Sequence, residues 1–243
     1  MKNEVNEKEP ARRNFLKRTL SLLPLAAVGS SLTPFTSSAV HKSFGDAVLN
    51  SYVSTFFNHE EWEFVLAVTN RLIPDDENGP GAISEGVPVF IDKQMELPYG
   101  HGSLWYMHGP FTANALPELG YQSNLTPRET WRRGIKSVNC YCRQRFNKSF
   151  QELSYERQDD ILCQLEDGRL SFEEIPGKLF FTQMLENTKE GYFADPLHGG
   201  NQTMASWRLI GFPGARADYP QVMDNPGKPY LLGPVSISGK RSV

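Results

Sequence analysis

Helical periodicity appears first after Asn58. Asn58 is a preferred N-cap residue, and Glu61 stands three positions on, where a carboxylate completes a capping box. The residues that follow on one helical face are Trp62, Val65, Leu66, Thr69 and Leu72. Pro74 ends this predicted helix, and a polar turn over residues 75–81 leads to a second helix, expected over residues 82–95.

The strongest helix start in the chain lies at Thr126. A capping threonine is followed there by Pro127 at the first helical position and by Glu129 at the third. One apolar stripe then continues for about five turns. Its members are Trp131, Ile135, Val138, Cys142 and Phe146. This stripe predicts a long helix with one buried face.

Shorter helices are expected further along. Ser154 predicts the cap of the next helix, and Gly168 its end. The last two predicted helices cover residues 179–188 and 203–210. In the final one Asn201 lies near the start, and Gly211 serves as a left-handed stop.

Helical patterns therefore account for most of the chain after residue 58, whereas runs of alternating β-branched residues are few. Long stretches rich in glycine, proline and aromatic residues separate the helices, for example residues 99–111. The expected fold class is all-α, an irregular helical domain with long loops over residues 40–243.

The N-terminus has the features of an export signal. Arg12 and Arg13 are followed by Phe15, Leu16 and Lys17, and then by an apolar run over residues 20–28. Paired arginines before a modest apolar stretch are typical of a cleavable twin-arginine signal, although Ala11 stands where Ser or Thr is usual. Small residues at positions 37–39 predict cleavage there, so the signal is expected over residues 1–39. The apolar run is too short for a stable membrane span.

Composition excludes one large class of partner. The formal net charge is −3, and no cluster of Lys and Arg persists beyond the signal, so nucleic acid is not expected to bind.

The three cysteines leave several pairing states open. Cys142 lies on the apolar stripe and is expected to be a buried thiol, while a Cys140–Cys163 or Cys142–Cys163 bridge could form after export, and any odd thiol could instead pair with a partner chain.

The most unusual stretch of the sequence is residues 191–214, called here the signature segment. Its glycines, prolines and large aromatic residues are interleaved, which is typical of a structured loop and not of a flexible linker. Asp195-Pro196 and Gly199-Gly200-Asn201 predict two defined turns. Packing within its own domain and contact with a partner both account for such a segment.

This segment resembles the signature of the gluconate 2-dehydrogenase subunit 3 family. The matching residues are Gly191, Phe193, Asp195, Pro196, Gly199, Gly200, Asn201, Trp207, Gly211, Phe212, Pro213 and Gly214. The small subunit of fructose dehydrogenase is similar. His198 departs from the tyrosine of many members. The resemblance extends over residues 62–219.

The resemblance implies an accessory, non-catalytic subunit of a membrane-associated dehydrogenase, gluconate 2-dehydrogenase (acceptor), which oxidises D-gluconate to 2-keto-D-gluconate. In that family FAD lies in a large subunit and c-type haem in a multi-haem cytochrome subunit. The small subunit supports export, folding or stability of the flavin subunit. The expected partners are these two subunits and the twin-arginine translocase, and the expected location is the periplasm, at the cytoplasmic membrane through the complex. The chain itself is expected to hold no cofactor, consistent with its lack of haem, iron–sulfur and dinucleotide motifs.

Two other functions are compatible with the residues. A free-standing, exported metal-dependent hydrolase would use His101, His108, Asp195 and His198, although these residues lack the spacing of a known metal motif. A periplasmic sugar-binding module would use the aromatic loops. The partner-facing surface is expected at the signature segment, where Trp207 is the candidate anchor.

Overall fold

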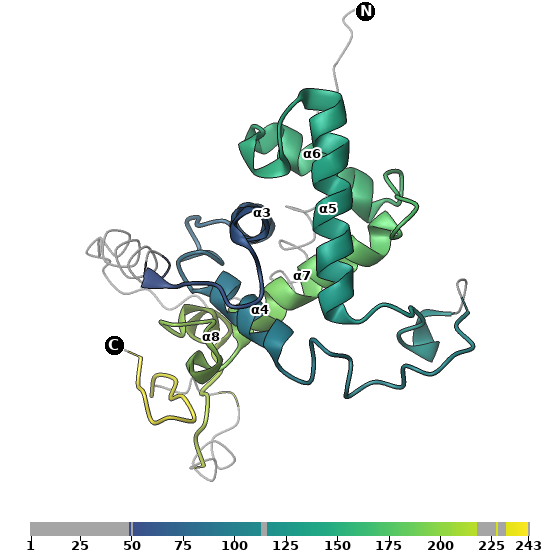
Figure 1. Cartoon of the computed structure of the whole chain (residues 1–243). Coiled ribbons are helices and arrows are strands. Elements are labelled where there is room, and N and C mark those ends of the chain that lie inside the picture. The colour runs from purple at the N-terminus through teal and green to yellow at the C-terminus, as the bar shows by residue number, and fades with distance from the viewer. Residues whose placement is uncertain (1–48, 50, 113–115, 218–226, 228–231, 243) are drawn as a thin grey trace, which may run out of the picture. The chain divides into compact units, whose positions relative to one another are not determined.

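The computed structural model describes residues 49, 51–112, 116–217, 227 and 232–242 (Figure 1). The predicted export signal, with Arg12, Arg13, Phe15, Leu16 and Lys17, lies outside the described residues, as does its predicted cleavage site.

The described residues form helices and loops without a named strand; their only β pairings are isolated bridges. The α-helices are α3 (His59–Leu72), α4 (Val87–Glu96), α5 (Pro127–Phe146), α6 (Tyr155–Glu166), α7 (Gly177–Phe193) and α8 (Ala205–Ile210). Short 3-10 helices are η1 (Pro117–Leu119), η2 (Phe150–Glu152) and η3 (Pro196–His198). The all-α prediction is confirmed for this part of the chain.

Both predicted capping boxes are present. Asn58 accepts a hydrogen bond from the Glu61 N–H at 3.0 Å, and the Glu61 carboxylate accepts one from the Asn58 N–H at 2.9 Å. Thr126 and Glu129 make the same reciprocal pair at the start of α5. These helix starts are set by residues three positions apart, which explains why the sequence predicts them.

Three helix boundaries differ from the prediction. Helix α4 begins at Val87, five residues later than expected, because Gly86 takes a left-handed conformation with φ 75° and residues 82–86 form turns. Helix α7 is longer at both ends than residues 179–188 and includes the start of the signature segment. Helix α8 is preceded by Met204, not by Asn201, at the N-cap position.

Helix α7 is central to the described fold, because it contacts each of the other five α-helices (Figure 1). Helix α5 packs against it at Gly134, where a Cβ atom would overlap the ring of Phe180. The Phe180 ring is fully buried, packed edge-on against Trp131 and stacked on Phe64. The aromatic core at this crossing therefore depends on the absence of a side chain at one position.

Candidate functional site

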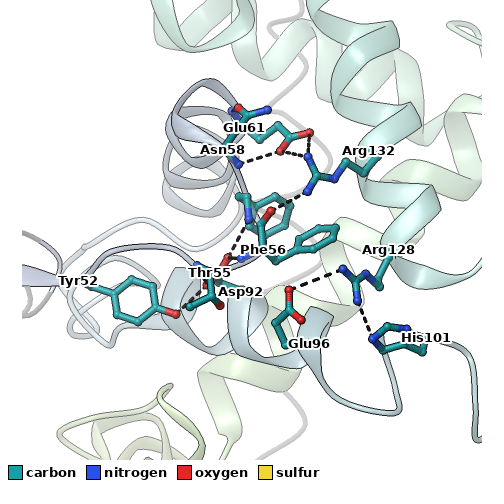
Figure 2. A network of polar contacts seen from close by, with 11 residues as sticks. Tyr52, Thr55, Phe56, Asn58, Glu61, Asp92, Glu96, His101, Arg128 and Arg132 are labelled. Carbon is teal, nitrogen blue, oxygen red and sulfur yellow. Dashed lines mark hydrogen bonds and ion pairs between the residues drawn. The ribbon is translucent and has the colours of Figure 1, made fainter.

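A buried carboxylate holds the segment that precedes the first described long helix. Residues 51–57, called here the arm, run across α4, where Asp92 is completely buried. Asp92 Oδ1 accepts hydrogen bonds from the N–H groups of Phe56 and Phe57 at 3.1 and 3.0 Å. Its Oδ2 accepts from the Tyr52 hydroxyl at 2.7 Å, and from the N–H and hydroxyl of Thr55 at 2.8 and 3.0 Å (Figure 2). Burial, together with this carboxylate, raises the pKa of Tyr52 above its usual range.

Two arginines on successive turns of α5 complete the attachment of the arm. The guanidinium groups of Arg128 and Arg132 lie 4.7 and 4.4 Å from the centre of the Phe56 ring. Arg132 also donates to both carboxylate oxygens of Glu61 and, at 2.7 Å, to the carbonyl oxygen of Phe56, while Arg128 donates to a ring nitrogen of His101 at 2.6 Å (Figure 2). Stacking and charge together fix Phe56 between α3, α4 and α5.

The signature segment starts inside α7, which corrects the expectation of a loop at Gly191. A Cβ atom on Gly191 would lie 2.8 Å from the ring of Phe90 and 3.0 Å from Val87, so this glycine lets α7 approach α4. Gly200 has a related role, because a Cβ there would overlap the backbone of Gly191. Gly214 likewise has no room for a side chain beside Trp207. These glycines are required by close packing.

Asp195 connects the signature segment to the end of the chain. It caps η3 by accepting from the Leu197 N–H at 3.0 Å, and it also accepts from the Ser236 hydroxyl and the Ile237 N–H, each at 2.8 Å. Burial alone would raise the pKa of Asp195, but the donors from Leu197, Ile237 and Ser236 together with the nearby His198 lower it. Residues 232–242 are thereby held against the signature segment.

The turn at Asn201 is fixed by side chains on both sides. Asn201 is fully buried with φ 46°, donates to the Ala194 carbonyl oxygen at 3.0 Å and accepts from the Ser206 hydroxyl at 2.8 Å. The next residues bind Glu85, whose buried carboxylate accepts from the N–H and hydroxyl of Thr203. The predicted turns are therefore present, and side-chain hydrogen bonds on both sides hold them.

Trp207 is part of the interior of the chain. Its side chain is 5% exposed, its indole N–H donates to the Phe193 carbonyl oxygen at 2.8 Å, and its ring packs edge-on against Phe212. The segment also exposes five large apolar side chains. They are Phe193, Leu197, Leu209, Ile210 and Phe212, with exposed fractions from 41% to 57%. That these side chains contact a partner remains a prediction.

The histidines of the hydrolase alternative do not form a metal centre. Within the described ranges no group of three or more His, Cys, Asp and Glu side chains could hold a metal ion. His101 instead accepts from Arg128, and Asp195 has the donors described above.

The three cysteines are present as thiols in this structure. No disulfide joins Cys140, Cys142 and Cys163. Cys142 is fully buried, as predicted, and burial raises the pKa of its thiol to about 12. Cys140 is exposed on the same helix.

Sequence reasoning missed the two carboxylates that organise this region, Asp92 and Glu85. Each is a charged residue in or just before α4, and both have 0% exposure. For Asp92 the one available signal was its place directly after the apolar run Val87–Ile91, since buried charges occur where partners satisfy them; Glu85, between Ser84 and Gly86, left none. Nothing in the sequence indicates that Ser236 and Ile237 donate hydrogen bonds to Asp195.

Comparison with known proteins identifies the family. A family model described as gluconate 2-dehydrogenase subunit 3 matches residues 59–214. The chain belongs to this family. Searches of curated proteins and of solved structures found no match. The matched range of this gluconate 2-dehydrogenase subunit 3 protein begins with α3 and ends at Gly214, beside Trp207. Asp92 and Asp195 lie inside the matched range. Their hydrogen-bond partners include residues outside it, in the arm for Asp92 and at residues 236–237 for Asp195.

Among the helices that the structure describes, none is both long enough and apolar enough to cross a membrane.

Proposed function

We propose that this chain is the non-catalytic small subunit of a periplasmic, membrane-associated, flavin-dependent sugar or sugar-acid dehydrogenase of the gluconate 2-dehydrogenase type. The family to which the chain belongs is described as subunit 3 of gluconate 2-dehydrogenase, and this membership carries the proposal. The partners would be a large FAD-containing subunit and a multi-haem cytochrome c subunit. The substrate pocket and the redox groups would lie in those chains.

The surface of the chain supports a role in assembly. Besides the exposed side chains of the signature segment, the loop before α5 exposes large apolar residues, as follows: Leu104, Tyr106, Phe111, Leu116 and Leu119, with exposed fractions from 37% to 81%. Single exposed apolar residues are common, but groups of them on one loop or helix end mark interaction sites. Two such groups in a small chain fit an obligate subunit with an extensive interface.

The export signal suggests when assembly occurs. The twin-arginine route carries folded proteins, and its usual clients acquire a cofactor in the cytoplasm. This chain has no recognisable cofactor motif, whereas a flavin subunit folds around its FAD. We therefore infer that the two subunits associate before export and that Arg12 and Arg13 direct both of them.

Replacing Arg12 and Arg13 together by lysine tests the export role. If the flavin subunit has no signal of its own, it should remain in the cytoplasm of cells that carry this variant. Cell fractionation followed by dehydrogenase assay and flavin fluorescence measures its location. Arg18→Lys, a change of the same kind just beyond the pair, should leave export unchanged. Normal periplasmic levels of the flavin subunit in the double variant would show that it travels independently.

A pair of substitutions in α8 separates contact with a partner from internal packing. Ile210 is 50% exposed, so Ile210→Ser should leave the isolated chain folded and weaken assembly about five- to thirty-fold. Trp207→Ala should instead destabilise the chain itself by about 3–5 kcal/mol, because it empties a buried site. Val53→Ser, at a side chain 82% exposed on the arm, is the matched control. Subunit dissociation measured by size-exclusion chromatography distinguishes these cases, and unchanged assembly with Ile210→Ser would remove α8 from the interface.

A further inference from the structure

An open hollow of about 710 Å³ lies at the connection between α5 and α6, and cationic side chains line it. Arg145 comes from the last turn of α5, Lys148 from the connection and Arg157 from the first turn of α6. Three elements that are successive in the chain thus direct positive charge toward one space. The hollow is remote in sequence from the signature segment.

These three cations form no ion pair with the described residues. Three other arginines of α5 do have carboxylate partners: Arg128 with Glu96, Arg132 with Glu61, and Arg143 with Glu60. Among the residues that the structure describes, the only carboxylate lining the hollow belongs to Glu152, and it accepts hydrogen bonds from the hydroxyl and N–H of Ser149. Those two bonds lower the pKa of Glu152, so it stays ionised. The charge of Lys148 also acts on this carboxylate, so three cations face one anion and the hollow keeps a net positive charge.

The arginines are also held in position. The guanidinium of Arg157 lies 4.8 Å from the centre of the Phe146 ring, and that of Arg145 lies 5.9 Å from it. Stacking on a ring orients a guanidinium and leaves its edge N–H groups available to a ligand. The connection itself is fixed, because Asn147 caps α5 in a left-handed conformation and Ser149 with Glu152 forms a capping box.

Helix α6 adds a further positive feature. Its N-cap residue, Ser154, lines the hollow, and the Ser154 side chain accepts no hydrogen bond from the first turn of the helix. The N-terminus of a helix carries partial positive charge and directs N–H groups outward, which favours a bound anion. The helix end and the three cations act on the same space.

We propose that this hollow binds the phosphate group of an anionic ligand. A phosphate presents several oxygens and matches the planar fork of arginine, so it can contact both arginines and Lys148 at once. The formal net charge of the chain is −3, so attraction to an anion arises locally and not from the molecule as a whole. Phosphate groups of this kind occur on anionic phospholipid surfaces and on small soluble ligands, and experiment distinguishes these sources.

The test compares the full chain with the variant Arg145→Gln/Lys148→Gln/Arg157→Gln. One arm measures co-sedimentation with vesicles of equal parts phosphatidylglycerol and phosphatidylcholine, and with vesicles of phosphatidylcholine alone. The other arm titrates inorganic phosphate by calorimetry. Each cation near an anionic surface contributes about five-fold in binding, so the triple variant should lose about 100-fold in partition to the anionic vesicles. The loss should diminish at high salt.

A second triple variant, Arg133→Gln/Lys178→Gln/Lys189→Gln, has the same change in net charge. Its three side chains are exposed and lie outside the hollow. Both variants share the apolar N-terminal run of the wild type, so that run cannot produce a difference between them. The single variant Lys148→Gln, with an expected loss of about five-fold, provides the measurement if the triple variant does not fold.

Binding to anionic vesicles that only the hollow variant loses would support the proposal with a lipid headgroup as the source. Saturable binding of inorganic phosphate that only this variant loses would support it with a soluble source. The proposal is overturned if the wild type binds neither probe, or if the two triple variants lose binding equally.

Discussion

Replacing Asp92 by asparagine should release the arm from the helical body. The carboxylate has 0% exposure and accepts five hydrogen bonds, two at Oδ1 and three at Oδ2. Asparagine keeps one acceptor oxygen and puts an NH₂ donor at the other position. If the amide replaces Oδ1, the N–H groups of Phe56 and Phe57 face a donor. If it replaces Oδ2, the N–H of Thr55 and the hydroxyls of Tyr52 and Thr55 face it.

The magnitude follows from the number of donors that lose their acceptor. In either orientation at least one buried or partly buried N–H group loses its acceptor, and at least one more donor loses its acceptor as well. Each unsatisfied buried donor costs about 1–3 kcal/mol. The uncharged amide no longer has to be buried as an ion, which offsets part of this cost. We expect Asp92→Asn to lower the free energy of unfolding by about 2–5 kcal/mol, a large part of the about 5–15 kcal/mol of a typical domain.

Urea unfolding followed by tryptophan fluorescence measures this loss, and limited proteolysis should show faster cleavage within residues 51–57. Asp160→Asn is the matched control: Asp160 is exposed on α6, accepts from the Gln164 amide, and should change stability by no more than about 0.5 kcal/mol. Equal midpoints for the two variants would refute the reasoning that Asp92 anchors the arm.

Three other predictions follow from buried groups. At neutral pH an alkylating reagent should modify Cys140 and leave Cys142 unmodified until the chain unfolds, because burial raises the pKa of the Cys142 thiol to about 12; mass spectrometry of the labelled peptides checks this. Gly134→Ala should lower the melting temperature, since overpacking against Phe180 costs about 1–3 kcal/mol or more and the better helix propensity of alanine returns about 1 kcal/mol; a raised melting temperature would contradict this. The folded state lowers the pKa of Asp195, so the stability that its ionised form contributes is complete well above the ordinary carboxyl pKa of about 4 and is lost as pH falls through the lowered value. The difference in unfolding free energy between the wild type and Asp195→Asn should therefore shrink in acid, and an equal difference at neutral and acid pH would count against the assignment.

Features set by nearby residues were predictable from the sequence. The capping boxes at Asn58 and Thr126 each involve a partner three positions away, and both helices start where expected. The start of α4 was misplaced because Gly86 introduces a left-handed turn that apolar periodicity does not register. The roles of Asp92 and Asp195 could not be predicted, because their partners lie up to 42 residues away along the chain and only the fold brings them together.

The candidate interface at α8 was also not predictable from the sequence alone. Sequence composition marks Trp207 as an anchor for a partner, since large aromatic residues concentrate interface energy. In the fold that side chain is directed inward, where it supports Phe193 and Phe212. Whether an aromatic residue points toward solvent or toward the core depends on where α8 lies, and α8 is placed by contacts distant in sequence. Its exposed neighbours Leu209 and Ile210 are less distinctive in the sequence.

The residues of the signature segment therefore serve internal packing more directly than contact with a partner. Gly191, Gly200 and Gly214 occur where helices or backbone segments approach too closely for a side chain, and Asn201 and Asp195 satisfy buried backbone groups. These residues build a rigid support from which the neighbouring apolar side chains project. A rigid surface loses little conformational freedom when a partner binds, so more of its contact energy appears as affinity. Under the proposed function, the signature would matter to the complex by holding Ile210 and its neighbours in place, and substitutions at its glycines would reduce assembly by destabilising the chain that presents them.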